Sequence, residues 1–390
     1  MQALSLMSKA QILTHNWDYI QESFCLGVPE LLQKKLDSWK KIAKEKYDND
    51  VGYTVFFGGE QMQINGSGVR GKSWVLKNDD FIIMIGAGNK DWKVSVRYLA
   101  GGLWEYSLLS MKDRILKCLL SEMHPQGITQ EVNSNDPQSW QRLSRADYAF
   151  DFYSPSFTAE MQNRQFNYNT LVMPARVKGD IVFSSTRIET ITIGLRAIKN
   201  LQIQIYDKSL ELTAIKGKEW MFKIYEEEGY HPPDELKHKH IWRVEIRIGK
   251  EFLKNHGGAT LQYLLENLQS FLITALKDRR LIIDNGEKNK ARDAQNHYLW
   301  DAVEKEINSA GNYMARGRFS SMRPEAKAEM LEKGIAGSLR SLQVLKTNDY
   351  HYSDSVILAQ DCALTAEKDP ENDKKIQKAK EKYKWEGEAN

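Results

Sequence analysis

The sequence has 390 residues and a mass of 45.0 kDa, which predicts two or three domains rather than one core. With 41% hydrophobic and 27% charged residues it is not disordered throughout, and three distant cysteines without a CxxC pair argue against a disulfide scaffold or a cysteine-built zinc site. No apolar run approaches the roughly 20 residues of a membrane helix. We therefore expect a cytoplasmic protein without membrane association. Its formal net charge of +3 is too small to demonstrate a polyanionic partner.

Residues 1–50 are predicted to form a helical N-terminal extension, because their apolar residues recur at helical spacing. These residues are Trp17, Ile20, Phe24, Leu31, Leu32 and Leu36. The stretch 34–46 is strongly basic. We interpret it as a solvated helix face, and a DNA contact is the alternative.

Residues 51–285 are predicted to form one α+β domain with two β-rich halves, at about 51–123 and 142–285. In each half, short runs of β-branched and aromatic residues alternate with turn residues, which is typical of an antiparallel meander. Helical spacing of leucines at 105–121 and 259–276, with a shorter helix near 156–165, places a helix after each meander. The expected fold class is α+β, with twisted antiparallel sheets, packed helices and a duplicated meander-plus-helix unit.

A helical region at 286–366 and a charged, disordered tail at 367–390 are expected after this domain. Within the helical region, the stretch 313–327 interleaves arginines, including Arg316 and Arg318, with Tyr313 and Phe319. Such interleaving suits contact with a single DNA strand. The alternative is a basic loop between helices.

Residues 66–73, GSGVRGKS, match the phosphate-loop pattern GxxxxGK[ST]. A phosphate loop requires a buried strand before it and a helix after it, so that backbone N–H groups surround the phosphates. The residues before this segment are short and polar, and those that follow it are strand-like. We therefore favour a glycine-rich turn that opens a hairpin over a nucleotide-binding loop.

Strand periodicity places an unusual set of polar residues on shared faces, because residues i and i+2 of a strand point the same way. The polar rows are Arg145, Asp147 and Asp151; Gln202, Gln204, Tyr206 and Lys208; Arg243, Glu245 and Arg247; and Thr190, Thr192 and Arg196. A solvated sheet face explains polarity, but aspartate is depleted in strands. Carboxylates, arginines and a tyrosine together suit metal-assisted phosphodiester chemistry. Both interpretations remain open from the pattern alone.

Three segments resemble the replication initiation factor family, which comprises rolling-circle initiators of plasmids and filamentous phages and related relaxases of conjugative elements. SRADYAFDFY (144–153) is similar to the family's R-x-D-x-A-x-D strand. TITIGLRAIKNLQIQIYDKSLE (190–211) is similar to its IGSR and lRIYdKglE segments, and WRVEIRIGKEFL (242–253) to its W-x-R-x-E strand. The segments occur in the family's order and spacing, and the resemblance covers about residues 51–276.

The resemblance implies that Tyr206 is the nucleophile, which attacks one strand of origin DNA and stays linked to the 5′-phosphate, while the free 3′-hydroxyl primes synthesis. Lys208 would contact the phosphate or stabilise the transition state. Asp147, Glu211 and Glu245, with Asp151 in reserve, would bind Mg²⁺ or Mn²⁺. The residues that would contact the DNA backbone are Arg145, Arg196, Arg243 and Arg247.

The predicted function is therefore a rolling-circle initiator that nicks an origin. The expected partners are locally melted origin DNA, a host helicase and a second copy of the chain. A conjugative relaxase with the same chemistry is the near alternative, and a non-enzymatic DNA-binding regulator is an alternative of another class. His238 and His240 stand two apart, as in the histidine pair of another nicking superfamily. Because Lys239 separates them, we interpret the two histidines as part of a solvated segment before the next strand rather than as metal ligands.

Overall fold

The computed structural model divides into two compact units, Met1–Arg318 and Phe319–Asn390, and the features below belong to the first. The structure describes residues 10–46, 52–87, 91–125, 140–162, 166, 171–173, 177–185, 187–194, 200–214, 220–233, 236, 239–256, 260–283, 294–310, 357, 359 and 360. Among these residues, no helix is both long enough and apolar enough to cross a membrane.

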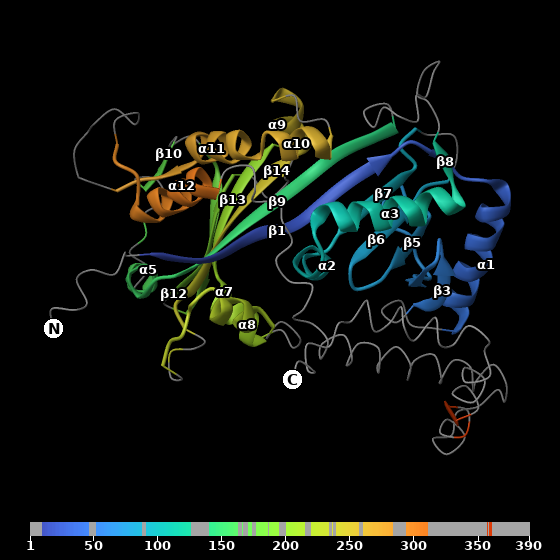
Figure 1. Ribbon diagram of the computed structural model, residues 1–390, viewed down its shortest axis with the longest axis horizontal. Coiled ribbons are helices and arrows are strands. Elements are labelled where there is room, and N and C mark those ends of the chain that lie inside the picture. The colour runs from blue at the N-terminus through green and yellow to red at the C-terminus, as the bar shows by residue number, and fades with distance from the viewer. Residues whose placement is uncertain are drawn as a thin grey trace, which may run out of the picture. The chain divides into compact units, whose positions relative to one another are not determined.

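In the described part of the chain, 11 strands form one antiparallel sheet in the order β11-β12-β13-β14-β9-β1-β7-β6-β5-β4-β3 (Figure 1). The strands are β1 (Gln11–Phe24), β3 (Tyr53–Phe57), β4 (Glu60–Ile64), β5 (Trp74–Lys77), β6 (Phe81–Ile85), β7 (Val94–Tyr98), β9 (Gln141–Tyr153), β11 (Gly179–Ser184), β12 (Arg187–Ile193), β13 (Leu201–Asp207) and β14 (Ile241–Gly249). Two short pairs lie outside it: β2 (Leu26–Gly27) with β8 (His124–Pro125), and β10 (Val172–Met173) with β15 (Arg280–Leu281).

The predicted helix over the first part of the chain is wrong, because Gln11–Phe24 is the long central strand β1. The strand contains a bulge at Asp18, which lengthens the interval between the core-facing residues Trp17 and Ile20 to three positions. Together with Phe24, four residues further on, this interval imitates the spacing of a helix. The prediction holds only for the second part, α1 (Glu30–Lys46).

The sheet consists of two similar halves that meet at its centre. Each half begins with a long strand, β1 or β9, continues through a meander, and returns to pair its last strand, β7 or β14, with that long strand. The long strands β1 and β9 pair antiparallel with each other and run side by side across the molecule (Figure 1). The predicted α+β class and the two successive meander units are therefore confirmed. The two units are joined through β1, a strand that the sequence analysis did not predict.

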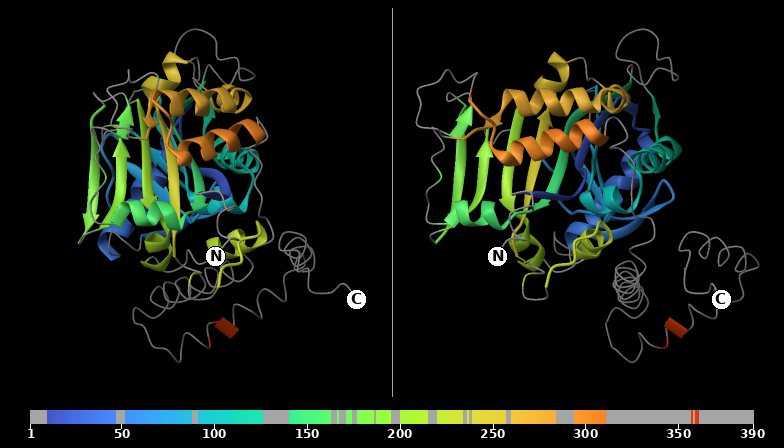
Figure 2. Two further views of the ribbon diagram at one scale, coloured as in Figure 1. Left: turned by 90° about the vertical axis from the view of Figure 1, so that its left-hand side faces the viewer. Right: turned by 60° about the vertical axis from the view of Figure 1, so that its left-hand side comes forward.

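Helices cover the apolar face of the sheet and part of the other face. The helices are α1, α2 (Ala100–Glu105), α3 (Leu108–Glu122), α5 (Pro155–Met161), α7 (Lys208–Ala214), α8 (Trp220–Glu227), α9 (Lys250–Asn255), α10 (Leu261–Glu266), α11 (Leu268–Asp278) and α12 (Tyr298–Ala310). Helices α9 to α12 lie on one side of β9, β13 and β14, and α7 and α8 lie on the other (Figures 1 and 2). The predicted helix 259–276 is interrupted at Asn267.

The glycine-rich segment 66–73 forms the turn between β4 and β5, which confirms the hairpin interpretation. Val69 and Lys72 exchange backbone hydrogen bonds of 3.1 and 2.8 Å, and Gly71 has a φ of 75°. A strand, β5, follows the turn where a phosphate loop would require a helix. The Lys72 ammonium donates to two backbone carbonyl groups, those of Trp92 (3.0 Å) and Lys93 (2.8 Å).

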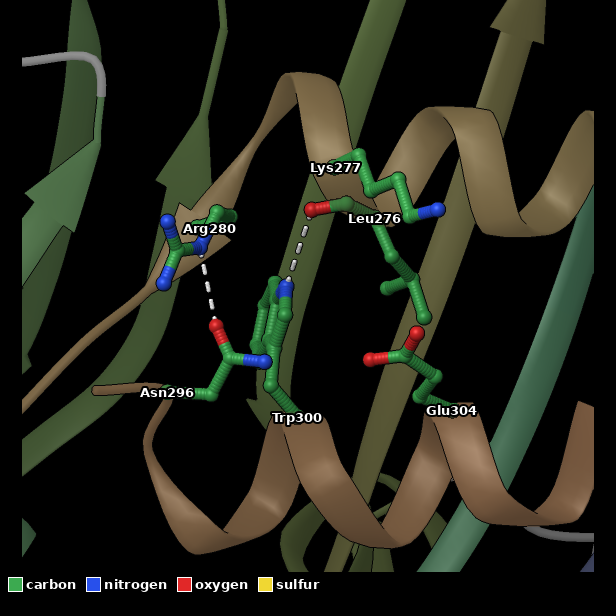
Figure 3. A pocket seen from close by; sticks show the side chains of 6 residues that line it. All are labelled: Leu276, Lys277, Arg280, Asn296, Trp300 and Glu304. Atoms are coloured by element: carbon green, nitrogen blue, oxygen red, sulfur yellow. Dashed lines mark hydrogen bonds between the residues drawn. The ribbon is translucent and has the colours of Figure 1, made fainter. Parts of the chain in front are cut away.

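A cavity of about 350 Å³ lies between α11 and α12. It is lined by Leu276, Lys277, Arg280, Asn296, Trp300 and Glu304 (Figure 3). The Trp300 ring separates the Arg280 guanidinium, which donates to Asn296 Oδ1 at 2.8 Å, from the carboxylate of Glu304. The cavity contains none of the site residues that the sequence predicts.

Replacement of Trp17 by Ala should lower the free energy of unfolding by about 3–5 kcal/mol, measured by urea denaturation. The side chain is 1% exposed and makes an edge contact with the Tyr148 ring at 4.9 Å between centroids, so its loss leaves a cavity at the β1–β9 pair. Phe56→Ala, at a side chain that is 68% exposed, is the control and should change stability by less than about 0.5 kcal/mol. Equal effects of the two substitutions would contradict a central position for β1.

Candidate active site

Strands β13, β14 and β9 place their polar residues on one face of the sheet. Residues directly opposite each other in an antiparallel pair point to the same face. The register forms three rows across these strands: Tyr206, Arg243 and Asp151; Gln204, Glu245 and Ala149; and Gln202, Arg247 and Asp147. Tyr206 therefore shares its face with the carboxylates of residues 147, 151 and 245. We call this face the polar face.

Arg243 lies at the centre of this arrangement, with 1% of its side chain exposed. Its guanidinium donates to both carboxylate oxygens of Asp151, at 2.5 and 2.8 Å, and to Asp18 Oδ1 at 2.5 Å. The Tyr225 hydroxyl on α8 donates to Asp151 Oδ2 at 2.7 Å. A buried charge is tolerated only when it is paired and hydrogen-bonded. The two aspartates supply that pairing, so Arg243 holds the site together and is not available as the predicted contact to the DNA backbone.

Asp18 reaches the site because of the bulge in β1. Trp17 pairs with Tyr148 and Tyr19 pairs with Asp147, which leaves Asp18 as the extra residue between them. A bulge redirects the side chain of the inserted residue, and here it brings a carboxylate from the first strand to Arg243 on β14. Sequence reasoning missed Asp18 because it assigned the segment to a helix. The β-branched and aromatic residues of ILTHNWDYI were the available signal for a strand.

The Tyr206 phenol is half-buried and surrounded by charge. Burial raises its pKa well above its usual value, the Arg243 guanidinium opposes that rise, and the carboxylates of Glu245, Asp18 and Glu211 add to it. The phenol is therefore protonated at neutral pH. Three carboxylates are close enough to raise the pKa of the phenol, and they come from three different elements, β14, β1 and α7.

Lys208 follows Tyr206 by two residues and begins α7. The Asp207 carboxylate accepts a hydrogen bond from the Leu210 N–H at 3.2 Å, which caps the helix and turns the chain directly after the strand. The Lys208 ammonium lies 5.7 Å from the centroid of the Tyr206 ring and donates to Glu211 Oε2 at 2.7 Å. Burial lowers the pKa of Lys208. The site therefore has one ammonium beside the phenol.

Asp147 and Glu245 form a second charged group beside two arginines. Arg145 donates to both oxygens of Asp147, and Arg247 donates to both oxygens of Glu245 at 2.8 and 3.0 Å. Burial and the neighbouring Glu245 carboxylate raise the pKa of Asp147 to about 8, against the opposing effect of the Arg145 and Arg247 guanidiniums. Arg145 and Arg247 keep 28% and 21% of their side chains exposed, so both remain accessible from solvent.

The four carboxylates that the resemblance assigns to a metal do not converge on one point. Each of them binds a cation of the chain: Asp147 binds Arg145, Asp151 binds Arg243, Glu211 binds Lys208, and Glu245 binds Arg247. In the described ranges, no three His, Cys, Asp or Glu side chains are grouped so that they could hold a metal ion. As arranged, the donor set does not fit a divalent ion.

The other predicted site residues fall elsewhere. Arg196, Arg316 and Arg318 lie outside the described residues, as does His238. The His240 ring makes an edge contact with Tyr153 at 6.0 Å between centroids. Tyr148 lies on the opposite face of the sheet, where its hydroxyl is 2.8 Å from His15 Nδ1. Of the tyrosines on β9, β13 and α8, Tyr206 and Tyr225 are the two that reach the polar cluster.

No protein-family model matches the sequence, and no curated protein matches it significantly. The assignment to the replication initiation factor family therefore stays a prediction. Among solved structures, the chain is similar to the rolling-circle replication initiator protein from Geobacillus stearothermophilus, with a TM-score of 0.40 and 13% identity over 76% of this chain and 97% of that one. A likeness at this level concerns the fold alone, and the arguments about function below rest on the residues of the site.

Asp147→Asn should flatten the decrease of unfolding free energy between about pH 5 and about pH 8. Because the pKa of Asp147 is raised above its usual value of 3.8, the folded protein keeps a proton that the unfolded chain has released in this range, so stability falls as the pH rises. Urea denaturation at several pH values measures the slope. Asp278→Asn, at an exposed carboxylate on α11, is the control and should leave the slope unchanged. An unaltered slope in the Asp147 variant would contradict the raised pKa.

Proposed function

We propose that this protein is a DNA strand transferase that starts rolling-circle replication, with Tyr206 as the nucleophile. The observation that carries the proposal is the position of the Tyr206 phenol, on one sheet face with Arg243 and Glu245 and beside the Lys208 ammonium. A tyrosine that is only part of a solvated sheet would not require a fully buried arginine opposite it. Positive charge next to a phenol suits attack on a phosphodiester, because charge develops there in the transition state.

The proposed step transfers one phosphodiester bond. The Tyr206 oxygen attacks a DNA phosphorus, a new phosphotyrosine ester forms, and the bond from phosphorus to the 3′-oxygen breaks. The phenol proton passes to a neighbouring carboxylate, for which Asp18, Glu211 and Glu245 are the candidates, and from there to the departing 3′-oxygen. One phosphodiester replaces another, so no external energy source is needed, and the free 3′-hydroxyl is a primer.

The chain's cations have different tasks in this proposal. The Lys208 ammonium stabilises the phenolate as it forms, and Arg243 keeps its two aspartates and Tyr206 in register. Arg145 and Arg247, which are partly exposed, are the groups that can reach the phosphates on either side of the scissile bond. Only the resemblance to the replication initiation factor family supports Mg²⁺ or Mn²⁺ as a cofactor of the proposed reaction.

A second function is favoured by two observations. Every acidic residue that would bind the metal is paired with a cation of the chain, and the raised pKa of Tyr206 opposes its activation. These features suit a DNA-binding regulator that does not nick. The two functions differ in one measurable product, a covalent protein–DNA adduct.

Wild-type protein incubated with 3′-labelled single-stranded DNA of random sequence and Mg²⁺ or Mn²⁺ should form a labelled adduct that survives denaturing electrophoresis. Tyr206→Phe should abolish the adduct, because it removes only the attacking oxygen. Tyr263→Phe, at a 37% exposed tyrosine on α10, should retain it.

Peptide mapping of the adduct should locate the DNA on Tyr206. An adduct that persists in the Tyr206→Phe protein, or that maps to Tyr225, would overturn the assignment. Specific DNA binding by the wild type without any adduct, in either metal, would support the regulator instead.

A further inference from the structure

A second group of residues lies on the polar face at β7, β1 and β9. Gln21 of β1 pairs with Arg97 on one side and Arg145 on the other, and Ser23 pairs with Ser95 and with Arg142. Cross-strand partners share a face, so the three arginines lie on the same face as Tyr206. Tyr19 pairs with Asp147, which joins this group to the third row of the candidate site.

Two of these arginines have no acidic partner. Within the described residues, neither Arg97 nor Arg142 forms an ion pair, and the Nε atom of each is buried without a hydrogen-bond partner. Arg145, Arg243 and Arg247 differ from them, because each is bound to a carboxylate. The polar face is therefore balanced in charge around Tyr206 and positive around Arg97 and Arg142.

Two half-buried aromatic rings accompany these cations. The Arg142 guanidinium lies 4.4 Å from the centroid of the Trp92 ring, and the Arg145 guanidinium lies 4.6 Å from that of Tyr19. Alternation of guanidinium groups and aromatic rings is the arrangement on which nucleic-acid bases stack while phosphates meet positive charge. We call Tyr19, Trp92, Arg97 and Arg142 the basic–aromatic strip.

Lys72 of the glycine-rich hairpin holds Trp92 in place. Trp92 has a φ of 59°, a left-handed conformation that is strained for a residue with a bulky side chain. The Lys72 ammonium donates to the carbonyl oxygens of Trp92 and Lys93, at 3.0 and 2.8 Å. The lysine of the GSGVRGKS segment thus binds the backbone at an aromatic residue and positions that residue.

We infer that the basic–aromatic strip binds single-stranded nucleic acid and guides one strand toward Tyr206. Bases stack on Trp92 and Tyr19, and Arg97 and Arg142 contact the phosphates between them. Positive charge and stacking surfaces together match a single strand, whose bases are free to stack, better than they match a duplex. This inference rests on the proposed function only for the direction of the strand, since binding itself requires no chemistry at Tyr206.

Binding of a fluorescent oligothymidylate of about 20 nucleotides tests the inference. The Tyr206→Phe protein is used throughout, so that no covalent step contributes. Trp92→Ala should weaken binding by about tenfold or more, and Trp92→Phe should retain most of it. Arg97→Gln and Arg142→Gln should each lower the slope of log affinity against log salt by about 0.7. Lys72→Met should weaken binding as Trp92→Ala does, because it releases the Trp92 loop.

Two matched controls exclude general effects. Trp39 on α1 also carries a cation on its ring, Lys35 at 4.7 Å, and Arg279 at the end of α11 also has a buried Nε atom without a partner. Trp39→Ala and Arg279→Gln should leave affinity and salt slope unchanged. Circular dichroism of each variant checks that it is folded.

Unchanged affinity in the folded Trp92 and Arg142 variants would overturn the inference, even if the wild type forms the Tyr206 adduct. Competition by polyglutamate as effective as that by oligothymidylate would also overturn it, because polyglutamate carries charge without bases. Loss of binding in these variants, together with no adduct in the wild type, would support the strip and refute the proposed nicking.

Discussion

The buried guanidinium of Arg243 is the constraint on which the rest of the polar face depends. A fully buried positive charge has to be compensated where it lies, and the compensation comes from Asp151 on the neighbouring strand and from Asp18 on the next one. Three segments that are far apart in the chain, β1, β9 and β14, are thereby fixed in register around one group. Tyr206 lies directly opposite that group, so its position is determined by the same compensation.

The polar face carries two kinds of arginine, which lie in different regions of it. Around Tyr206, guanidiniums and carboxylates are matched nearly one to one, which gives an almost neutral network. Toward β7, Arg97 and Arg142 have no acidic partner among the described residues, and they stand beside aromatic rings. A polyanion would be attracted to the region around Arg97 and Arg142. The region around Tyr206 would fix the positions of the side chains that the polyanion contacts there. Affinity and chemistry would then be supplied by neighbouring parts of one sheet.

Much of this arrangement could be predicted from the sequence. Period-two alternation located β9, β13 and β14 and placed Tyr206, Asp147 and Glu245 on shared faces, because these three strands pair with one another without a register shift. The first strand could not be recognised by the same rule, since the bulge at Asp18 gives its core residues the spacing of a helix. The ion pairs could not be predicted from the sequence either. The periodicity of a strand indicates on which face of the sheet a side chain lies, but not which side chain it binds. Carboxylates that appeared available for a metal are instead bound to arginine and lysine.

The position of β1 also affects how the chain acquires its structure. Gln11 pairs with Tyr153, and the other edge of the strand pairs with β7. During synthesis, the edge of the first strand that pairs with β7 therefore stays unsatisfied until the chain has been made as far as Tyr98, and the edge that pairs with β9 until it has reached Tyr153. Pairing across such long intervals slows folding and leaves exposed edges open to association with other chains.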